Sequence, residues 1–303
     1  MKHREGTLEV TGEDSLYYQY WLPDGDIRAA LQVVHGAGEH GGRYDRLAAY
    51  CGKRGFAVVA NDHPGHGRSH GVRVHVDRFD DYLVAVEHFH RQVQADFPGL
   101  PVFLVGHSLG GLIASLYLLD HQAAYAGCVL SGPAIATDIE PGWLQTLIIK
   151  TLSRVYPTAG VLQLDANGVS RDPAEVQRYL DDPLVHNGKM TARMVSELFN
   201  AMGEIKASAG RIALPLLLMH GGEDAMTSPE GSRLLHRAIS SEDRELKIYP
   251  GLYHEIFNEP EHSAVFADLL SWCEARLPSA AAADSSPVES NLARNDISGE
   301  QVS

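Results

Sequence analysis

The feature that most constrains the fold is a short turn between two apolar stretches. Residues 102–105 form a strand-like run, and Leu109 begins the apolar stretch LGGLIASLYLL, which is typical of a helix. Between them, Gly106-His107-Ser108-Leu109-Gly110 matches the pattern G-x-S-x-G. Small residues on both sides of the serine permit a sharp strand-to-helix turn, which presents the hydroxyl at a helix amino terminus. We therefore expect a β-α unit with Ser108 as a nucleophile at its turn.

Strand-like and helix-like segments alternate along most of the chain. Predicted strands cover residues 7–10, 16–21, 29–34, 56–61, 102–105, 127–130, 214–219 and 246–250. Predicted helices cover residues 43–54, 79–97, 109–121, 229–239 and 261–276. Several strands are continuous apolar runs, which is typical of strands covered on both faces. The pattern predicts an α/β fold with a mostly parallel sheet and helices on both of its faces.

One interval interrupts this alternation. Residues 133–210 have helical rather than strand patterns, and we interpret them as a cap inserted over a core of residues 1–132 and 211–278. Within the cap, apolar residues recur at the spacing of one helix face: Trp143, Leu144, Leu147, Ile148, Leu152 and Val155. That face either packs on the core or forms a lipid-facing entrance that can rest on a membrane. Residues 279–303 are rich in Ala and Ser and are expected to be disordered.

Composition disfavours several classes of function. The 303 residues carry a formal net charge of −14, whereas nucleic-acid-binding proteins present clustered Lys and Arg to phosphates. No run approaches the roughly 20 apolar residues of a membrane helix, and the first residues lack the apolar core of a signal peptide. We therefore expect a cytoplasmic protein, at most peripheral at membranes. The three cysteines, Cys51, Cys128 and Cys273, are expected to be buried thiols.

No cofactor or metal is expected. The sequence contains neither a P-loop nor a dinucleotide-binding fingerprint. Residues 62–69 include Asp62, His63 and His66, but their glycine and proline neighbours are typical of a tight loop. No further ligand follows at zinc-like spacing. We interpret these histidines as structural.

A serine nucleophile needs a histidine base and a carboxylate that orients it. In sheets of this kind the partners follow later strands, in the order Ser, then Asp or Glu, then His. Asp224 lies in the loop after predicted strand 214–219 and is the expected acid, with Glu223 as the alternative. His254 follows the last predicted strand and is the expected base. His262, inside the final predicted helix, is the weaker alternative.

The reaction of such a serine also needs two amide donors for the developing oxyanion. Leu109, next to the serine, is the expected first donor. The second is expected in His35-Gly36-Ala37-Gly38, after predicted strand 29–34, with Ala37 as the donor. The alternative is a glycine-rich turn that only links strand and helix. His35 and His107 are interpreted as orienting or packing residues.

Several longer strings go beyond these general patterns. They are HGAGEHGGRYDRLA, NDHPGHGRSHG, PGLPVFLVGHSLGG, SRDPAEVQRYLDDPLV, HGGEDAMTSP and GLYHEIFNEP. Together they resemble the monoacylglycerol lipase and lysophospholipase family, also known as hydrolase-4, within the α/β-hydrolase superfamily. The resemblance spans about residues 5 to 277.

The resemblance implies a capped α/β-hydrolase that cleaves monoacylglycerols, with Ser108, Asp224 and His254 as triad. Ala37 and Leu109 would form the oxyanion hole. It also implies that three residues lie near the polar alcohol of the substrate: Glu39, Arg43 and Tyr179. The expected partner is a small lipid ester, with transient membrane contact through the cap and no protein partner. The alternatives are a lysophospholipase, a short-chain carboxylesterase or thioesterase, and a non-catalytic lipid-binding protein.

Overall fold

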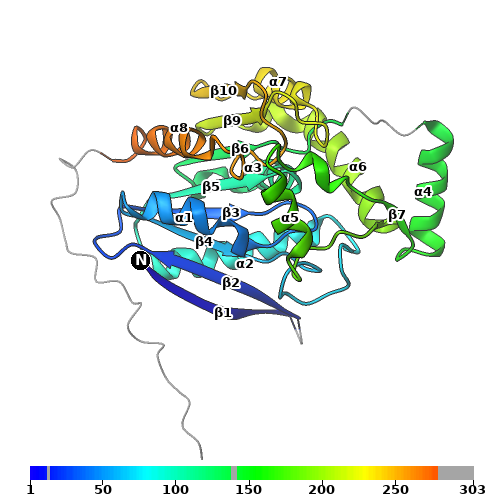
Figure 1. Ribbon diagram of the computed structural model, residues 1–303, viewed down its shortest axis with the longest axis horizontal. Helices are drawn as coiled ribbons and strands as arrows, with labels where there is room; N and C mark the ends of the chain where they lie inside the picture. Colours follow the sequence, from blue (N-terminus) through cyan, green and yellow to red (C-terminus); the bar gives the residue numbers. More distant parts are fainter. Residues whose placement is uncertain (12–13, 138–141, 279–303) are drawn as a thin grey trace, which may run out of the picture.

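The computed structural model describes residues 1–11, 14–137 and 142–278. An eight-stranded sheet forms its centre, in the order β1-β2-β4-β3-β5-β6-β9-β10 (Figure 1). Only β2 runs antiparallel to its neighbours, and the pairs from β4 to β10 are all parallel. The strands are β1 (Lys2–Thr11), β2 (Asp14–Leu22), β3 (Ala29–Val34), β4 (Phe56–Asn61), β5 (Val102–His107), β6 (Gly127–Ser131), β9 (Leu216–Gly221) and β10 (Arg244–Tyr249). The predicted mostly parallel sheet is present.

Helices cover both faces of the sheet, as predicted. On one face, α1 (Asp45–Gly52) and α8 (His262–Glu274) pack against the strands. On the other face lie α2 (Asp80–Asp96), α3 (Leu109–His121) and α7 (Pro229–Ala238). Every residue of β3, β4, β5, β6 and β9 is buried, which explains why these strands read as continuous apolar runs. The helix predicted over residues 43–54 divides into η1 (Gly41–Tyr44) and α1. The other short 3-10 helices are η2 (Gln122–Ala124), η3 (Ala166–Gly168) and η4 (Ala209–Arg211).

In the residues that the structure describes, the interval between β6 and β9 adds no strand to the main sheet. It contains α4 (Trp143–Val155), α5 (Pro173–Asp181) and α6 (Ala192–Ser208). A two-stranded antiparallel pair, β7 (Gly160–Leu162) with β8 (Met190–Thr191), also lies here and has too few residues to give a strand pattern in the sequence. Helix α6 packs on α3, and α4 rests on α6. The division into a core and a cap at residues 133 and 210 stays a prediction, and the predicted tail at 279–303 lies outside the described residues.

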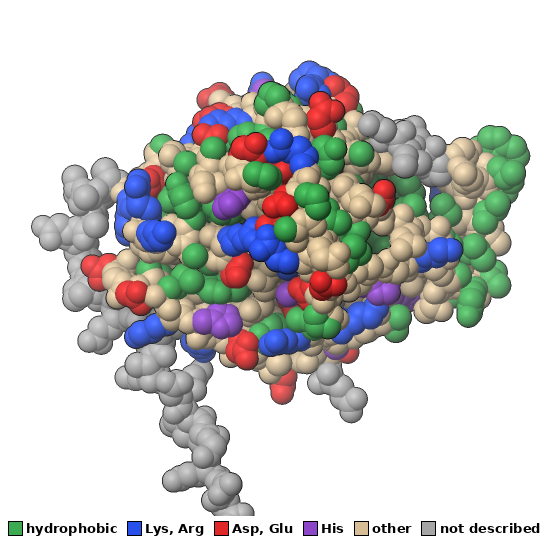
Figure 2. All heavy atoms as spheres, viewed as in Figure 1, with side chains coloured by type: hydrophobic (Ala, Val, Ile, Leu, Met, Phe, Trp, Pro, Cys, Tyr) green, Lys and Arg blue, Asp and Glu red, His purple; other side chains and the backbone are tan. Residues whose placement is uncertain are grey.

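Helix α4 projects from the end of the molecule with its apolar residues outward (Figures 1 and 2). Trp143 is 79% exposed and Leu147 is 55% exposed, and Ser153 is the helix's single buried residue. The packing of this face on the core, one of the two expectations, is therefore not observed. No helix in the described part of the chain is long and apolar enough to cross a membrane.

Candidate active site

Ser108 lies at the turn between β5 and α3 in a backbone conformation that residues other than glycine rarely adopt. Its φ is 53° and its ψ is −118°, a strain that persists only where the surroundings fix it. The Ser108 amide donates to the Ser131 carbonyl, and the Ser108 carbonyl accepts from the Gly111 amide, each at 3.0 Å. A side chain on Gly110 would approach the Val34 carbonyl oxygen to 1.9 Å, so the turn requires glycine where it crosses β3. The predicted strand-to-helix turn is thus formed.

Asp224 and His254 meet at the same edge of the sheet. Asp224 follows β9 and His254 follows β10, and both are buried. The His254 Nδ1 atom lies 2.6 Å from Asp224 Oδ2. The other oxygen, Oδ1, accepts from the amides of Met226 at 2.8 Å and Thr227 at 2.9 Å. The carboxylate is therefore held from two sides, and the imidazole is oriented with Nδ1 toward it.

The charges of this pair favour an ionised aspartate. Burial alone would raise the pKa of Asp224, but the His254 imidazole and other hydrogen-bond donors outweigh it and hold that pKa well below its usual range. Burial alone would lower the pKa of His254, but Asp224 outweighs it and raises that pKa, with further contributions from Glu255 and Glu39. A carboxylate beside an imidazole of raised basicity is the arrangement that general-base chemistry uses.

The two alternatives to this pair lie elsewhere. Glu223 is exposed, whereas Asp224 is buried. His262 begins α8, where its Nδ1 lies 2.8 Å from the Glu259 carbonyl and its ring lies against Phe266. In the described residues, Glu223 and His262 form no hydrogen bond or ion pair with each other. Asp224 and His254 therefore remain the better candidates for acid and base.

Residues next to Ser108 lie against His254, which places the two side chains in the same part of the site. The His107 ring, next to Ser108 in the chain, lies 4.7 Å from the His254 ring. A side chain on Gly132, which follows the residue that anchors the Ser108 amide, would lie 3.3 Å from His254 Nδ1. Among the described residues no hydrogen bond joins the Ser108 hydroxyl to His254. Such bonds are often long without substrate and shorten when it binds.

The loop after β3 lies directly against the serine. A side chain on Gly36 would come within 3.2 Å of the Ser108 Cβ atom. The Gly36 amide donates to Glu39 Oε1 at 2.6 Å, and the Gly38 carbonyl accepts from the His186 amide at 2.7 Å. Ala37 lies between these two anchored glycines, and its amide donates to no acceptor in the described part of the chain. The amide is thus held in place and free to donate.

Leu109 supplies a second available amide. It is the first residue of α3, and the first amides of a helix have no acceptor within it. The preceding amide, of Ser108, is already committed to the Ser131 carbonyl. The amides of Leu109 and Ala37 are thus both available to donate, and their role as oxyanion donors stays a prediction.

His35 and His63 connect the Ala37 loop to the loop after β4 through two hydrogen bonds. The His35 Nε2 atom accepts from the His63 amide at 2.9 Å, and the His63 Nε2 atom lies 3.0 Å from the His35 carbonyl. Burial lowers the pKa of His63 to about 3, so its ring is neutral. His107 is likewise buried, and burial lowers its pKa to about 4. His35 and His107 therefore act as packing residues, in line with their interpretation from the sequence.

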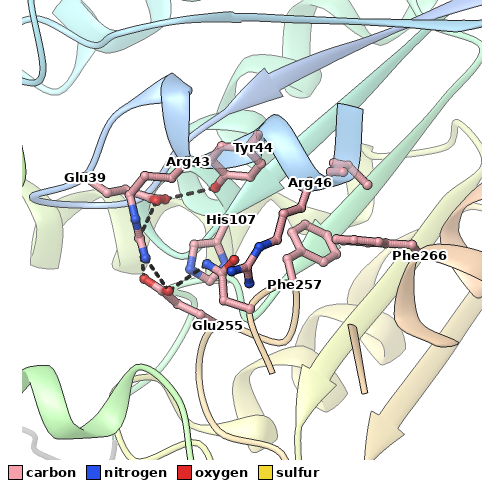
Figure 3. Close-up of a pocket in the computed structure, with 10 residues that line it drawn as sticks. Glu39, Arg43, Tyr44, Arg46, His107, Glu255, Phe257 and Phe266 are labelled. Atoms are coloured by element: carbon pink, nitrogen blue, oxygen red, sulfur yellow. Dashed lines mark hydrogen bonds and ion pairs between the residues drawn. The ribbon is translucent and has the colours of Figure 1, made fainter. Parts of the chain in front are cut away.

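Glu39 and Arg43 form a buried ion cluster beside the site (Figure 3). Arg43 binds Glu39 Oε2 at 2.9 Å and both oxygens of Glu255, at 2.6 and 2.7 Å. Burial alone would raise the pKa of Glu255, but the Arg43 guanidinium outweighs it and lowers that pKa to about 2. Glu39 also accepts from the Tyr44 hydroxyl at 2.9 Å. The cluster connects the Ala37 loop to the loop of His254.

A pocket opens beside Ala37. It is small, with a volume of about 20 Å³, and has Tyr179 in its wall, whose ring lies 4.8 Å from the Arg43 guanidinium. Two polar atoms at this wall, His186 Nε2 and Asn187 Oδ1, are buried without a hydrogen-bond partner. Of the three residues expected near a polar alcohol, Tyr179 lines this pocket, and Glu39 and Arg43 lie behind it in the ion cluster. Their predicted contact with substrate stays a prediction.

The loop at residues 62–69 is organised by its own hydrogen bonds. Asp62 accepts from the amides of Gly41 and Arg68, each at 2.8 Å. The His66 Nδ1 atom lies 3.0 Å from the Pro64 carbonyl. Within the described ranges, no group of three or more His, Cys, Asp or Glu side chains is arranged to hold a metal ion.

Reasoning from the sequence missed three residues that contact the Asp224–His254 pair or its loop: His220, Thr227 and Glu255. His220 is a polar residue inside the apolar strand β9, and that exception was the available signal. Thr227 follows Asp224 by three residues, a spacing at which a carboxylate accepts from local amides. Glu255 gave no signal, because its partner Arg43 is far away in the sequence.

Comparison with known proteins identifies the family. The Hydrolase_4 family model, described as serine aminopeptidase S33, matches residues 25–261, which include Ser108, Asp224 and His254. The chain belongs to this family. Its Hydrolase_4 relatives include the monoacylglycerol lipase of Mycolicibacterium smegmatis, 40% identical over 276 residues, which make up 90% of this chain and 98% of the relative. The human monoglyceride lipase is 36% identical over 271 residues, 88% of this chain and 89% of the relative.

Solved structures of similar proteins share the fold. The crystal structure of the Paleococcus ferrophilus monoacylglycerol lipase has a TM-score of 0.78 and 33% identity, and the match covers 86% of this chain and 99% of that one. A soluble variant of the Saccharomyces cerevisiae monoglyceride lipase, in complex with a substrate analog, has a TM-score of 0.81 at 24% identity and covers 90% and 95%. The predicted α/β-hydrolase fold of this Hydrolase_4 member is confirmed.

Proposed function

We propose that this Hydrolase_4 member hydrolyses monoacylglycerols to glycerol and a free fatty acid. Its family and its relatives identify it as a carboxylic ester hydrolase, and relatives that align over most of the chain are named for monoacylglycerol hydrolysis. The observation that carries the proposed mechanism is the 2.6 Å hydrogen bond between His254 and Asp224, at the sheet edge where Ser108 lies. In this mechanism Ser108 is the nucleophile, His254 the base and Asp224 the orienting acid.

The first half of the reaction transfers the acyl group to the enzyme. Ser108 Oγ bonds to the ester carbon while His254 Nε2 takes the hydroxyl proton, and the carbonyl oxygen becomes an oxyanion. The amides of Ala37 and Leu109 donate to that oxyanion. When the tetrahedral intermediate collapses, the bond to the glycerol oxygen breaks, and His254 gives its proton to that oxygen. Glycerol leaves, and the acyl chain remains bonded to Ser108.

The second half uses the same groups on water. His254 takes a proton from a water molecule as its oxygen bonds to the acyl carbon, and the two amides again hold the oxyanion. Collapse breaks the bond to Ser108 Oγ, which regains its proton from His254. The fatty acid leaves, and the starting state is restored without any cofactor.

The surroundings of Ala37 fit a small polar leaving group. The pocket beside it has two unpartnered polar atoms, on His186 and Asn187, and the Tyr179 ring in its wall. Both atoms are buried, so a glycerol hydroxyl would donate to the amide oxygen of Asn187 or bond the His186 ring once the pocket widens on binding. A hollow of about 250 Å³ between α4 and α6 has apolar walls at Ile149, Phe199 and Met202, where part of an acyl chain could lie.

The exposed face of α4 supports transient contact with a membrane. An apolar helix face that no other part of the described chain covers is suited to rest among lipid acyl chains. Lys150 and Arg154 on the same helix are exposed, and their positive charge favours approach to anionic lipid headgroups. The helix would then bring the cap to the surface in which monoacylglycerols reside.

The test is a hydrolysis profile of the purified protein. We expect kcat/KM for 1-monooleoylglycerol in detergent micelles to exceed that for dioleoylglycerol and for oleoyl lysophosphatidylcholine by at least about tenfold, because a lost or added polar contact in a closed pocket costs about that much. Equal or higher activity on lysophosphatidylcholine would contradict the proposal and favour a lysophospholipase. Activity confined to short p-nitrophenyl esters would favour a simple carboxylesterase.

A labelling experiment tests the nucleophile separately. A serine-directed fluorophosphonate should add to one peptide, that of Ser108, and not to the Ser108→Ala protein. Ser115, a buried serine on α3, is the internal control, since its hydroxyl donates to the Gly111 carbonyl at 2.7 Å. A wild-type protein without label would favour the non-catalytic lipid-binding alternative.

A further inference from the structure

The carboxylate of Asp224 lies between two imidazoles, of which the proposed mechanism uses only one. Oxygen Oδ2 is 2.6 Å from His254 Nδ1 and 3.1 Å from Nε2 of His220. His220 lies in β9 and has no exposed surface. Its other ring nitrogen, Nδ1, is 2.7 Å from the hydroxyl of Ser232, a fully buried residue of α7. A chain of hydrogen bonds thus runs from α7 through Asp224 to His254.

The acceptors around His220 determine where its proton lies. Nε2 faces the Asp224 carboxylate and also the Thr227 carbonyl, at 3.1 Å, and both of these groups can only accept. The proton is therefore on Nε2, and Nδ1 must accept the hydroxyl hydrogen of Ser232. Ser232 thereby fixes the tautomer in which His220 donates to Asp224.

His220 supplies a donor that the neighbouring threonine does not guarantee. The Thr227 hydroxyl has one hydrogen and two oxygen acceptors in range, Asp224 Oδ2 at 2.9 Å and the Gly132 carbonyl at 3.0 Å. The nitrogens His254 Nδ1 and His220 Nε2 lie farther from it, at 3.3 and 3.4 Å. When that hydrogen points to Gly132, the donors on Oδ2 are His254 and His220. Because a carboxylate shared among several donors is less basic, it attracts the proton of His254 less than a carboxylate that serves His254 alone.

We propose that His220, fixed by Ser232, is a positioning residue that donates to Asp224 and thereby moderates how strongly the carboxylate retains the His254 proton. The proposal rests on the proposed function, in which His254 must be neutral to accept a proton. It sets the acid side of the pH profile: a stronger hold on the proton keeps His254 charged, and inactive, up to a higher pH.

Other charged groups act on His254 as well, and a change at position 220 leaves them in place. Glu255 on its own loop and Glu39 on the Ala37 loop favour the charged form, and both are bound to Arg43. His107 at the end of β5 contacts the His254 ring and opposes the charge. Of these groups, none is among the hydrogen-bond partners of His220. An effect of its substitution therefore reaches His254 through Asp224 and through the Thr227 hydroxyl, which lies 3.4 Å from His220 Nε2 and 3.3 Å from His254 Nδ1.

The experiment compares His220→Leu with His220→Gln in the full-length protein. Leucine fills similar volume and donates nothing, whereas the glutamine amide places a donor near the Nε2 position. The measurement is kcat and KM for p-nitrophenyl butyrate, a water-soluble ester, between pH 5 and pH 9. For His220→Leu we expect kcat to fall about tenfold with KM within about twofold, and the acid limb of kcat/KM to move up by about half a pH unit or more. His220→Gln should restore most of both.

The direction of the shift separates this role from a merely structural one. If His220 only filled space, leucine would replace it and the acid limb would stay in place. If His220 only kept Asp224 near His254, its loss would let Asp224 move away, and the acid limb would move to lower pH. Either of those outcomes would overturn the proposal, as would a His220→Gln protein as impaired as His220→Leu. Ser232→Ala, which removes only a hydroxyl, should shift the acid limb in the same direction as His220→Leu by a smaller amount, and it carries the test if His220→Leu fails to fold.

The proposed function and this inference can fail separately. A wild-type protein that hydrolyses no ester would overturn both. An active wild-type protein whose pH profile and kcat are retained in His220→Leu and Ser232→Ala would overturn the role of His220 alone, and the roles of Ser108, Asp224 and His254 would stand.

Discussion

Helices α3 and α4 have 13 residues each and similar apolar content, yet they occupy opposite environments. In α3, 11 residues from Leu109 to Leu119 are buried. In α4, the one buried residue is Ser153, and the large apolar side chains face outward (Figure 2). One helix is built into the core beneath the serine, and the other presents its apolar surface at the edge of the molecule.

The difference lies in how apolar residues are distributed around each helix. Helix α3 is apolar on all sides and has glycines at positions 110 and 111 that let it pack against β3 and Pro133, which is typical of a fully buried helix. In α4, Thr146, Ile149 and Ser153 lie on the side toward α6. The exposed side carries Trp143, Leu144, Leu147 and Ile148. Burial in α3 fixes the geometry around Ser108, whereas exposure in α4 leaves an apolar surface that we propose contacts lipid.

The largest expected effect on kcat is at Ser108, which precedes the buried helix α3. Ser108→Ala should lower kcat on monooleoylglycerol by about 10⁶, by analogy with the nucleophile of a protease triad, because no other group then forms the acyl-enzyme. The measurement is single-turnover and steady-state hydrolysis, with circular dichroism as the control for folding. A fall of less than about a hundredfold would assign the chemistry to another residue.

Asp224→Asn should lower kcat by about 10⁴, again by analogy with a protease triad, since the amide no longer fixes the tautomer of His254. It also removes the main cause of the raised pKa of His254. His254 would then lose its proton at lower pH, so the acid limb of kcat/KM should move down. Glu223→Gln, at an exposed neighbour, is the matched control and should leave kcat within about twofold. An equal loss in both variants would contradict the assignment of Asp224.

The free energy of unfolding should respond differently to substitutions in α3 and in α4. Leu118 on α3 is fully buried and Ile148 on α4 is 49% exposed. Leu118→Ala should lower the free energy of unfolding by about 2–5 kcal/mol, through lost burial and a new cavity. Ile148→Ala should change it by no more than about 0.5 kcal/mol, as is usual for surface positions. Urea denaturation of both variants measures the difference, and a comparable loss in Ile148→Ala would mean that α4 packs on the rest of the chain.

The sequence predicted the parts of the molecule that follow from order along the chain. Ser108, Asp224 and His254 could be named because carboxyl ends of parallel strands meet at one edge, and each residue follows a strand. The contacts of His220 with Ser232 and of Arg43 with Glu255 depend on how separate loops pack, and no local pattern records that. Periodicity likewise predicted a helix near Trp143 but not the direction of its apolar face, because the same spacing serves burial and exposure.

The smallest expected effect is on vesicle binding, and it tests the exposed apolar face of α4. Leu144, Leu147 and Ile148 on α4 are 53%, 55% and 49% exposed. Changing all three to Gln, which keeps helix propensity, removes apolar area that would enter a bilayer, and at about 25 cal/mol per Å² this should weaken binding to phosphatidylcholine vesicles at least about tenfold. Turnover of p-nitrophenyl butyrate should change less than about twofold. Vesicle co-sedimentation with increasing lipid measures the binding.

Val72 and Val84, which are 56% and 45% exposed on other parts of the surface, provide the matched control when both are changed to Gln. Their replacement removes apolar area of similar kind without touching α4, so vesicle binding should stay within about twofold of the wild-type value. If the valine variant lost as much binding as the α4 variant, general surface hydrophobicity would account for the association. If neither lost binding, α4 would not be the contact, and its outward apolar face would need another occupant.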